Sequence, residues 1–569
     1  MMEIENMIMQ KKKIINVARG IEQADLVFKN ACYLNVFSLT WERGDIAIID
    51  GIIAATGGEY SGKSEIDAKD KWIVPGLIDG HIHLESAIVA PFEFAKIAIS
   101  HGTTTVVTDP HEVANVMGSD GIKFMLESTE NIGLDVMVCL PSCVPATPLD
   151  ENYMTLNAED IYEFYDHPRI VGLAEMMNYV GVINSDKDVL KKIADSQQRG
   201  RIIDGHAPGV CGRDLDAYVA AGVSSDHECD NYENALEKLK KGQYIMIREG
   251  TAAKNLHSLM PLLTPSLYSR CMFSTDDKHP NDLLNKGHID YIVRECFDNK
   301  IDKALVLKTA SFNAAQYFGF KGKGALAGGY IADMVVLNDL DSFDISMVLK
   351  NGKIMYENGK MPEIKEPDLN HELKEKAFSS MNCEKLKESS IKCTRKGLIG
   401  LVAGEIITKD LGYADAPNPD KDILKAVVVE RHHNTGHIGI GYVKGYGLKK
   451  GAVATSVSHD SHNIIAVGSS DKDICTVVNE VIKNGGGIFV TDSEKICGLP
   501  LNICGVMSDE PLETVNEKLE YAKEFAYSLG VSQSIDPFMT LSFLSLPVIP
   551  EIKITTKGVF DVLSWKYKE

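Results

Sequence analysis

Eight short apolar runs recur along the middle of this chain, and a stretch with helical character follows each of them. Short apolar runs bounded by turn signals are typical of buried parallel strands, which need crossover connections, usually helices. Repeated strand–helix units over roughly 250 residues predict a (β/α)8 TIM-like barrel. The predicted strands are Gly76–His83, Thr103–Thr108, Asp135–Leu140, Ile170–Glu175, Arg201–His206, Val223–His227, Tyr244–Arg248 and Cys271–Asp276.

A well-marked helix is predicted between the fourth and fifth of these strands. Ser185 is a good N-cap residue, Asp188 lies three residues further on, and Gly200 follows as a stop signal. A polar cap at one end and a glycine just past the other are the usual boundaries of a helix. We therefore expect one of the crossover helices to begin at Ser185.

Two β-rich patches flank the predicted barrel. The first seventy residues are predicted to be β, with Asp50-Gly51 as a hairpin turn. A similar patch follows the barrel and has Asn351-Gly352 as its turn. An Asp-Gly or Asn-Gly pair between alternating runs is a strong hairpin signal. The two patches predict one small β-sandwich domain built from both flanks.

These patterns divide the chain into four parts. We expect the composite β-sandwich at 1–70 and 323–362, and the metal-dependent barrel at 71–322. A connector rich in Lys and Glu spans 363–396. A new β-rich pattern with glycine-rich turns begins at Gly397 and predicts a C-terminal α/β domain at 397–569.

The charge balance restricts the partners. The chain of 569 residues has 59 Lys and Arg against 80 Asp and Glu, a net charge of −21. Nucleic-acid binders need a basic surface, so we expect no nucleic acid. The chain has no run of 18 apolar residues, so we expect no membrane span. The charged and apolar residues at the N-terminus do not follow the order typical of a signal peptide. The 12 cysteines form no C-x-x-C pair, which favours a reducing cytoplasm.

The ends of the predicted strands carry side chains that bind metals. His81 and His83 lie two residues apart, so strand alternation places them on one face at the rim where barrel active sites form. Four other strands end in the same way. Imidazole with carboxylate suits Zn²⁺, Mn²⁺ or Fe²⁺, and six ligands exceed one tetrahedral set. Two bridged metal ions are therefore expected, with a bound water turned into a hydroxide nucleophile. The predicted ligands are His81, His83, Glu175, His206, His227 and Asp276.

Several segments carry a resemblance to known families. Residues 75–83, PGLIDGHIH, resemble the first-strand signature of the amidohydrolase superfamily, and residues 328–336, GGYIADMVV, resemble the strand that returns such chains to their small β domain. Four further segments are similar to the bacterial adenine deaminase family. They are TDPHE at 108–112, MIREGT at 246–251, STDDKHP at 274–280 and SHDSHN at 458–463.

The resemblance covers nearly the whole chain and implies a hydrolytic deamination. Metal-activated hydroxide would attack C6 of adenine, giving hypoxanthine and ammonia. Asp276 and Glu175 are the expected catalytic residues, with Asp276 as the proton shuttle. Dihydroorotases, hydantoinases and ureases use a carboxylated Lys at the fourth strand, where this chain has Glu175. The expected metals are Mn²⁺ or Fe²⁺, with Zn²⁺ as an alternative, and we expect a homo-oligomer, a dimer or larger.

Other residues have open roles. His111 and Glu112 follow the second strand and either contact the purine or cap the next helix. Arg248 and Glu249 end the seventh strand and either hold a ring nitrogen or pair with each other. His459 and His462 suit a lid contact, an accessory metal or a structural role. Two alternatives to the deaminase stay open: a cyclic-amide or nucleobase hydrolase of the same superfamily, and a barrel without catalysis.

Overall fold

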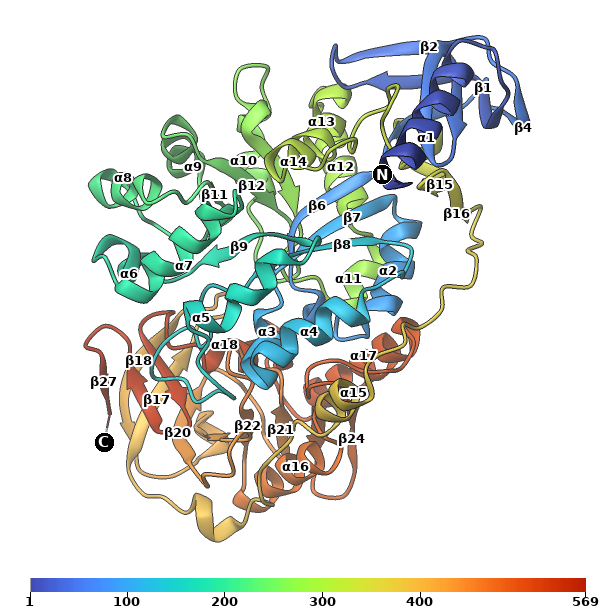
Figure 1. Ribbon diagram of the computed structural model, residues 1–569. Helices are drawn as coiled ribbons and strands as arrows, with labels where there is room; N and C mark the ends of the chain where they lie inside the picture. Colours follow the sequence, from blue (N-terminus) through green and yellow to red (C-terminus); the bar gives the residue numbers. More distant parts are fainter. Residues whose placement is uncertain (1, 569) are drawn as a thin grey trace.

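Eight parallel strands, interleaved with helices, form the middle of the computed structural model, which describes residues 2–568 (Figure 1). The strands form a five-stranded sheet, β10-β9-β8-β7-β6, and a three-stranded sheet, β11-β12-β13. All eight predicted runs are strands. They are β6 (Leu77–Ile82), β7 (Thr103–Thr108), β8 (Asp135–Leu140), β9 (Ile170–Met176), β10 (Ile202–Gly205), β11 (Ser225–Asp226), β12 (Tyr244–Arg248) and β13 (Cys271–Ser274).

The two sheets meet at both of their edges. Next to β11, the Ser224 amide donates to the Ile203 carbonyl of β10 at 2.9 Å. At the other edge Ile82 of β6 forms a parallel bridge with Asp276, whose amide donates to the His81 carbonyl at 3.0 Å. The parallel strands therefore follow one curled surface, called here the curled sheet. Its first and last strands are neighbours, which gathers the carboxyl ends of the strands on one side.

Helices cover the outside of the curled sheet, as expected for parallel strands buried on both faces. The helix predicted to begin at Ser185 is α7 (Lys187–Gln198), and its N-cap is Asp186, whose Oδ1 accepts from the amides of Asp188 and Val189 at 3.0 Å each. The prediction was wrong by one residue because Ser185 adopts a φ of 62° in the preceding turn. The other helices of this region include α2 (Pro91–Ser100), α3 (His111–Met117), α4 (Ser119–Ser128), α8 (Gly212–Ala220), α9 (Tyr232–Lys240) and α12 (Ile289–Asp298).

Strands from both flanks of the middle region share one eight-stranded sheet, in the order β16-β15-β14-β5-β1-β2-β3, with β4 paired to β1. The two predicted hairpin turns are present, and Asp50, Gly51, Asn351 and Gly352 all have the positive φ that such turns require. That the sheet forms a sandwich stays a prediction. The strands are β1 (Ala24–Asn35), β2 (Thr40–Ile49), β3 (Ile52–Gly58), β4 (Gly62–Asp67), β5 (Trp72–Pro75), β14 (Met334–Asp339), β15 (Asp344–Lys350) and β16 (Lys353–Glu357).

The N-terminal segment corrects the prediction that the first seventy residues are all β. Residues 2–18 form the helix α1 (Met2–Ala18), a segment rich in Met, Ile, Lys and Glu and without Gly or Pro. Most of these residue types favour helix. Val17 is buried against the sheet, and most of the other described side chains of α1 are exposed.

The C-terminal region, 397–569, is built on an eight-stranded mixed sheet, in the order β18-β17-β20-β19-β22-β21-β23-β24. The connector before it holds α15 (His371–Phe378). The strands are β17 (Lys396–Leu401), β18 (Thr408–Ala414), β19 (Leu424–Val429), β20 (Ile438–Lys444), β21 (Ala452–Thr455), β22 (Ile464–Gly468), β23 (Gly487–Thr491) and β24 (Ile496–Pro500). The longer helices are α16 (Asp471–Lys483), α17 (Leu512–Ser528) and α18 (Pro537–Leu544), and a small sheet of β25 (Ile552–Thr555), β26 (Gly558–Asp561) and β27 (Lys566–Tyr567) follows.

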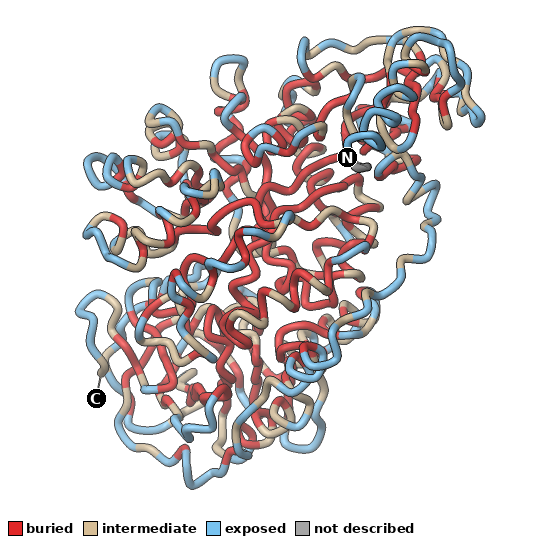
Figure 2. Tube along the Cα trace, in the orientation of Figure 1, coloured by how far each residue is buried: buried red, intermediate tan, exposed pale blue. Residues whose placement is uncertain are grey.

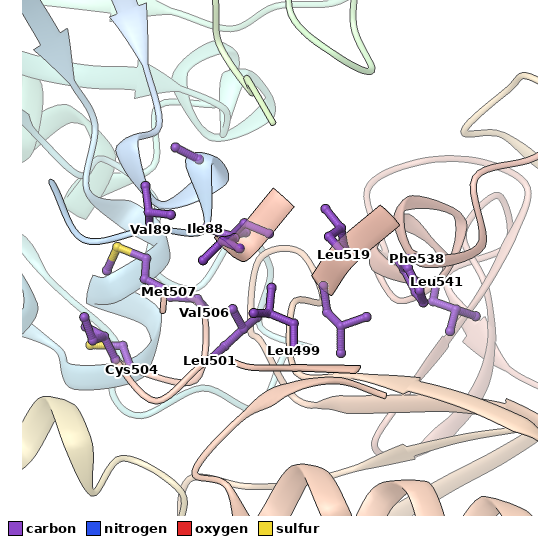
Figure 3. Packing of buried hydrophobic residues seen from close by; sticks show 14 of the residues in the cluster. Ile88, Val89, Leu499, Leu501, Cys504, Val506, Met507, Leu519, Phe538 and Leu541 are labelled. Carbon is purple, nitrogen blue, oxygen red and sulfur yellow. The ribbon is translucent and has the colours of Figure 1, made fainter. Parts of the chain in front are cut away.

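The middle and C-terminal regions share one hydrophobic core. Figure 2 shows buried chain running from the curled sheet into the C-terminal region. In Figure 3, Ile88 and Val89 of the middle region lie beside Val506 and Met507 of the C-terminal region. Here Val89 forms a parallel bridge with Ser508, and the Ser508 amide donates to the Ile88 carbonyl at 2.9 Å. This contact brings the C-terminal region against the side where the strands of the curled sheet end.

Within residues 2–568, none of the helices combines the length and the apolar character of a membrane span.

Candidate metal centre

Six predicted ligands lie at the carboxyl ends of strands of the curled sheet. One lies inside β6 and one directly after it, one lies in β9, one directly follows each of β10 and β11, and the last is two residues beyond β13. Five of the six are buried, and the imidazole of His206 is partly exposed. The structure brings together His81, His83, Glu175, His206, His227 and Asp276.

The carboxylate of Glu175 lies between two pairs of imidazoles. Its Oε1 is 3.3 Å from Nε2 of His83 and 4.0 Å from Nε2 of His81. Its Oε2 is 2.6 Å from Nδ1 of His206 and 3.2 Å from Nε2 of His227. One oxygen therefore faces each pair, the arrangement that a carboxylate shared between two cations requires.

Asp276 completes the first pair. Its Oδ1 is 3.1 Å from Nε2 of His83 and 3.7 Å from Nε2 of His81. Nδ1 of His83 lies 3.1 Å from the Asp109 carbonyl and donates to it, which leaves Nε2 facing the two carboxylates. Nε2 of His81 is buried and has no hydrogen-bond partner among the described residues. A buried nitrogen without a partner is costly, and a metal ion would satisfy it, so these residues fit a transition-metal site.

The charge of the centre depends on Arg248 at the end of β12. This guanidinium, whose side chain is 12% exposed, pairs with Asp276 and with Glu228. Burial acts to raise the pKa of Asp276, but Arg248 and His83 outweigh it and hold that pKa well below its usual value. Burial likewise acts to raise the pKa of Glu175, which His206, His227 and His83 hold well below its usual value. Both carboxylates are therefore ionised and able to bind a cation.

A buried carboxylate beneath the centre fixes its geometry. Asp79 of β6 accepts from the amides of Thr275 and His81, at 3.1 and 3.2 Å, and lies 3.0 Å from Nε2 of His288. These contacts tie β6 to the end of β13, where Asp276 lies. Sequence reasoning missed Asp79, because two of its partners, Thr275 and His288, lie about two hundred residues away, although it lies two residues before His81 in the signature segment.

The four predicted peripheral residues His111, Glu112, His459 and His462 also come together. Nδ1 of His459 is 2.7 Å from Oε1 of Glu112, and Nε2 of His462 contacts the other oxygen. Nδ1 of His111 is 3.6 Å from Oε1 of Glu175. The C-terminal region therefore reaches the edge of the metal centre through two histidines.

Arg248 and Glu249, predicted to hold the substrate or each other, have separate partners. Arg248 pairs with two carboxylates of the centre. Glu249 is buried; its Oε1 is 3.6 Å from the Lys254 ammonium, and its Oε2 has no partner among the described residues. Their mutual ion pair is therefore not formed, and a substrate contact stays a prediction.

Sequence reasoning missed three further acidic residues of the site. Asp109 contacts His111, Glu228 lies 3.5 Å from Nε2 of His227, and Asp460 groups with His111 and Glu112. Each is adjacent in sequence to, or one residue removed from, a residue that was singled out. Asp109 and Asp460 lie inside the segments 108–112 and 458–463 that were singled out, and Glu228 directly follows His227, so these positions were the available signal.

A cavity of about 140 Å³ lies between this rim and the C-terminal region. Its lining includes Ser86 and Asp277 from the middle region, and His459, Met539 and Phe543 from the C-terminal region. The rings of Phe543 and His459 stack with centroids 4.8 Å apart. The cavity thus combines a flat aromatic wall with polar groups next to Asp276.

Two family models match the chain. The amidohydrolase family matches residues 72–355, which contain the curled sheet and all six ligands. The adenine deaminase C-terminal domain matches residues 405–566, which contain His459, Asp460 and His462.

Curated proteins resemble the chain over almost its full length. An adenine deaminase 2 of Carboxydothermus hydrogenoformans is 46% identical over 561 residues, covering 97% of this chain and 98% of that protein. An adenine deaminase of Clostridium acetobutylicum is 44% identical, covering 97% and 99%. Among solved structures, a β-aspartyl dipeptidase of Fervidobacterium islandicum has a TM-score of 0.46 at 17% identity, covering 60% of this chain and 99% of that one.

Proposed function

The chain belongs to the adenine deaminase family of amidohydrolases, and we propose that it catalyses the hydrolytic deamination of adenine to hypoxanthine and ammonia. The observation that carries this proposal is the Glu175 carboxylate between two pairs of histidines, in a chain at least 44% identical to two adenine deaminases over 97% of its length. The cyclic-amide alternative is weaker because its enzymes bridge their metals with a carboxylated Lys, and this chain has Glu175 instead. We take the curled sheet to be the (β/α)8 barrel.

The family implies a divalent metal, and we propose that this centre holds two ions. His81, His83 and Asp276 would hold one, His206 and His227 the other, and Glu175 would contact both. The donor set suits Mn²⁺ or Fe²⁺, with Zn²⁺ as an alternative. When bound, such ions lower the pKa of a bound water from 15.7 to roughly 7 and so supply a nucleophile at neutral pH.

The remaining chemistry is assigned to residues of the chain. Asp276 is ionised, so its carboxylate can accept the proton of the attacking water and pass it to N6, which leaves as ammonia. Arg248 holds Asp276 in place and keeps it charged between proton transfers. Glu175 aligns the two imidazole pairs on either side of its carboxylate.

We place the purine at the cavity between Asp277 and Phe543, where a planar, uncharged base can lie against an aromatic wall. Contacts of His111, Glu112, Arg248 and Glu249 with the base stay predictions. Glu249 has a buried oxygen without a partner among the described residues, but it does not line this cavity. The cytoplasmic location and the homo-oligomeric state also stay predictions.

A substrate panel tests the proposal. Ammonia release is measured from adenine, adenosine, guanine and cytosine, and ring opening from dihydroorotate and a hydantoin. We expect turnover of adenine only, with one ammonia per hypoxanthine formed. Removal of the His81 or Asp276 side chain, in His81→Ala or Asp276→Ala, should abolish this turnover while the protein stays folded.

The matched control is Asp195→Ala, because Asp195 is a partly buried aspartate that is not one of the six ligands and does not line the cavity. Full activity in His81→Ala would contradict the assignment of the centre. Turnover of the hydantoin or dihydroorotate instead of adenine would favour the cyclic-amide alternative. A folded protein without bound metal that turns over none of the six compounds would favour a barrel without catalysis.

A further inference from the structure

We propose that His111, Glu112 and Asp460 form an additional site for a divalent cation at the junction of the middle and C-terminal regions. One ligand atom of each of the three lies within 4.8 Å of the others, and all three side chains are buried. The set shares no residue with the six ligands of the centre described above. Asp460 comes from the C-terminal region, so the site is complete only when that region is docked.

His111 presents a ring lone pair to this site. Its Nδ1 is 3.0 Å from Oδ2 of Asp109, so Nδ1 carries the proton and donates it to that carboxylate. In the neutral ring, the form that binds a metal, Nε2 is then unprotonated, and it lies 3.6 Å from Oε1 of Glu112. A histidine that donates one ring N–H to a carboxylate is the usual support of a metal ligand, because the hydrogen bond fixes the tautomer and the ring.

Asp460 supplies a carboxylate oxygen that nothing else uses. The residue is 6% exposed, and its Oδ2 has no hydrogen-bond partner among the described residues. Within residues 2–568, Asp460 and Glu112 form no ion pair with a Lys or Arg. Their partners are histidines, and Nδ1 of His459 lies 3.9 Å from Oδ1 of Asp460. A buried carboxylate oxygen facing another carboxylate and an imidazole lone pair is unfavourable unless a cation lies between them.

Glu112 is held in place by two donors that are not ligands themselves. Nδ1 of His462 accepts from the Ser458 amide at 3.2 Å, so the proton of a neutral His462 is on Nε2, which contacts Oε2 of Glu112. Nδ1 of His459 is 2.7 Å from Oε1 of Glu112. Carboxylate ligands are typically oriented by hydrogen bonds of this kind. His459 and His462 therefore act as positioning residues for the additional cation.

The types of ligand restrict which cations can bind at this site. Two carboxylates with one imidazole suit Mn²⁺ and other divalent first-row ions of similar hardness, whereas Cu⁺ prefers thiolate and thioether. The additional site should therefore fill with the same metal as the main centre when the enzyme is reconstituted with Mn²⁺ alone.

The test is a count of bound metal. Wild-type enzyme and Asp460→Asn are stripped, reconstituted with Mn²⁺, freed of excess metal by gel filtration and analysed by plasma mass spectrometry. We expect Asp460→Asn to hold one Mn²⁺ per chain fewer than the wild type, whatever the wild-type total. The matched control is Asp150→Asn, a neighbouring carboxylate whose Oδ2 already accepts from Thr147 at 2.8 Å, which should keep the wild-type count.

Equal counts in Asp460→Asn and the wild type, or a loss of more than one ion, would overturn the proposal. Because a substitution at a buried position can prevent folding, crystals of the Mn²⁺-loaded wild-type enzyme give a second measurement. Anomalous scattering at the manganese edge should show a peak between His111, Glu112 and Asp460. Peaks at the main centre without one here would also overturn it. This test does not depend on adenine turnover, so its failure is distinct from failure of the proposed function.

Discussion

At the scale of single residues, the guanidinium of Arg248 is the side chain on which the metal centre depends most. Arg248 separates Asp276 from Glu228, which would otherwise face each other as uncompensated buried charges. Breaking a buried ion pair by removing one partner typically costs about 3–5 kcal/mol, because the remaining charge is left unpaired. Arg248 therefore contributes both to the stability of the protein and to keeping Asp276, the proposed proton shuttle, ionised.

We predict that Arg248→Gln lowers kcat for adenine by at least about 100-fold, the order found when a positioned electrostatic donor is removed. The same variant should lower the free energy of unfolding by about 3–5 kcal/mol. Steady-state kinetics and thermal unfolding measure the two effects. The control is Lys483→Gln, which removes an exposed ion pair with Glu480 at 2.8 Å and should change stability by less than about 1 kcal/mol. Wild-type kcat in Arg248→Gln would contradict this role.

Single residues also mark what sequence can and cannot predict. His81, His83, Glu175, His206, His227 and Asp276 could be found because strand alternation and strand ends are local patterns. The roles of Asp79 and Asp460 could not be predicted, although both lie in segments that were singled out, since these roles depend on which atoms face them across the fold. Asp79 meets Thr275 and His288, and Asp460 meets His111, which lies in another region.

At the scale of elements, α18 connects the C-terminal region to the site. Asp536 caps this helix by accepting from the amides of Phe538 and Met539 at 2.9 and 3.0 Å, and it pairs with Lys523 at 2.7 Å. The Ser542 carbonyl accepts from the His459 amide at 3.0 Å, and Phe543 stacks on the His459 ring. The position of one wall of the cavity therefore depends on α18 staying folded.

We predict that Asp536→Ala speeds amide hydrogen exchange in α18 by roughly fivefold, because a lost N-cap costs about 1 kcal/mol. KM for adenine should rise as the cavity wall loosens. Asp186→Ala is a matched control, since Asp186 caps α7 with the same geometry and does not line the cavity. It should speed exchange in α7 and leave KM unchanged. An unchanged exchange rate in α18 of Asp536→Ala would contradict the role of Asp536 as a cap. An unchanged KM would show that α18 does not influence adenine binding.

Elements were predicted best where their signal is local and strong. The eight strands of the curled sheet and both hairpin turns follow from apolar runs and from Asp-Gly or Asn-Gly pairs. The start of α7 was misplaced because Ser185 and Asp186 are both good caps, and only backbone geometry chooses between them. Helix α1 was missed because its helical residues precede a β-rich stretch and bury little surface.

At the scale of the whole molecule, the C-terminal region is joined to the middle region by a continuous core. Ile88 and Val89 lie against Val506 and Met507 (Figure 3). These contacts join segments more than four hundred residues apart, and no local pattern in the sequence predicts which apolar side chains meet. The shared core explains how Asp460 and His459 can be held at the metal centre with a fixed geometry.

We predict that the two regions unfold together, so calorimetry of the metal-loaded protein should show one transition that coincides with loss of deaminase activity. Met507 is fully buried in the shared core, and Met507→Ala should lower the free energy of unfolding by about 2–5 kcal/mol and move that single transition to lower temperature. Met9→Ala is the control, because Met9 is 62% exposed and should change stability by less than about 0.5 kcal/mol. Two well-separated transitions in the wild type, with only one of them shifted by Met507→Ala, would show that the regions fold independently. The histidines of the C-terminal region would then be held at the centre only by their own contacts, and the cavity wall would be mobile on the timescale of turnover.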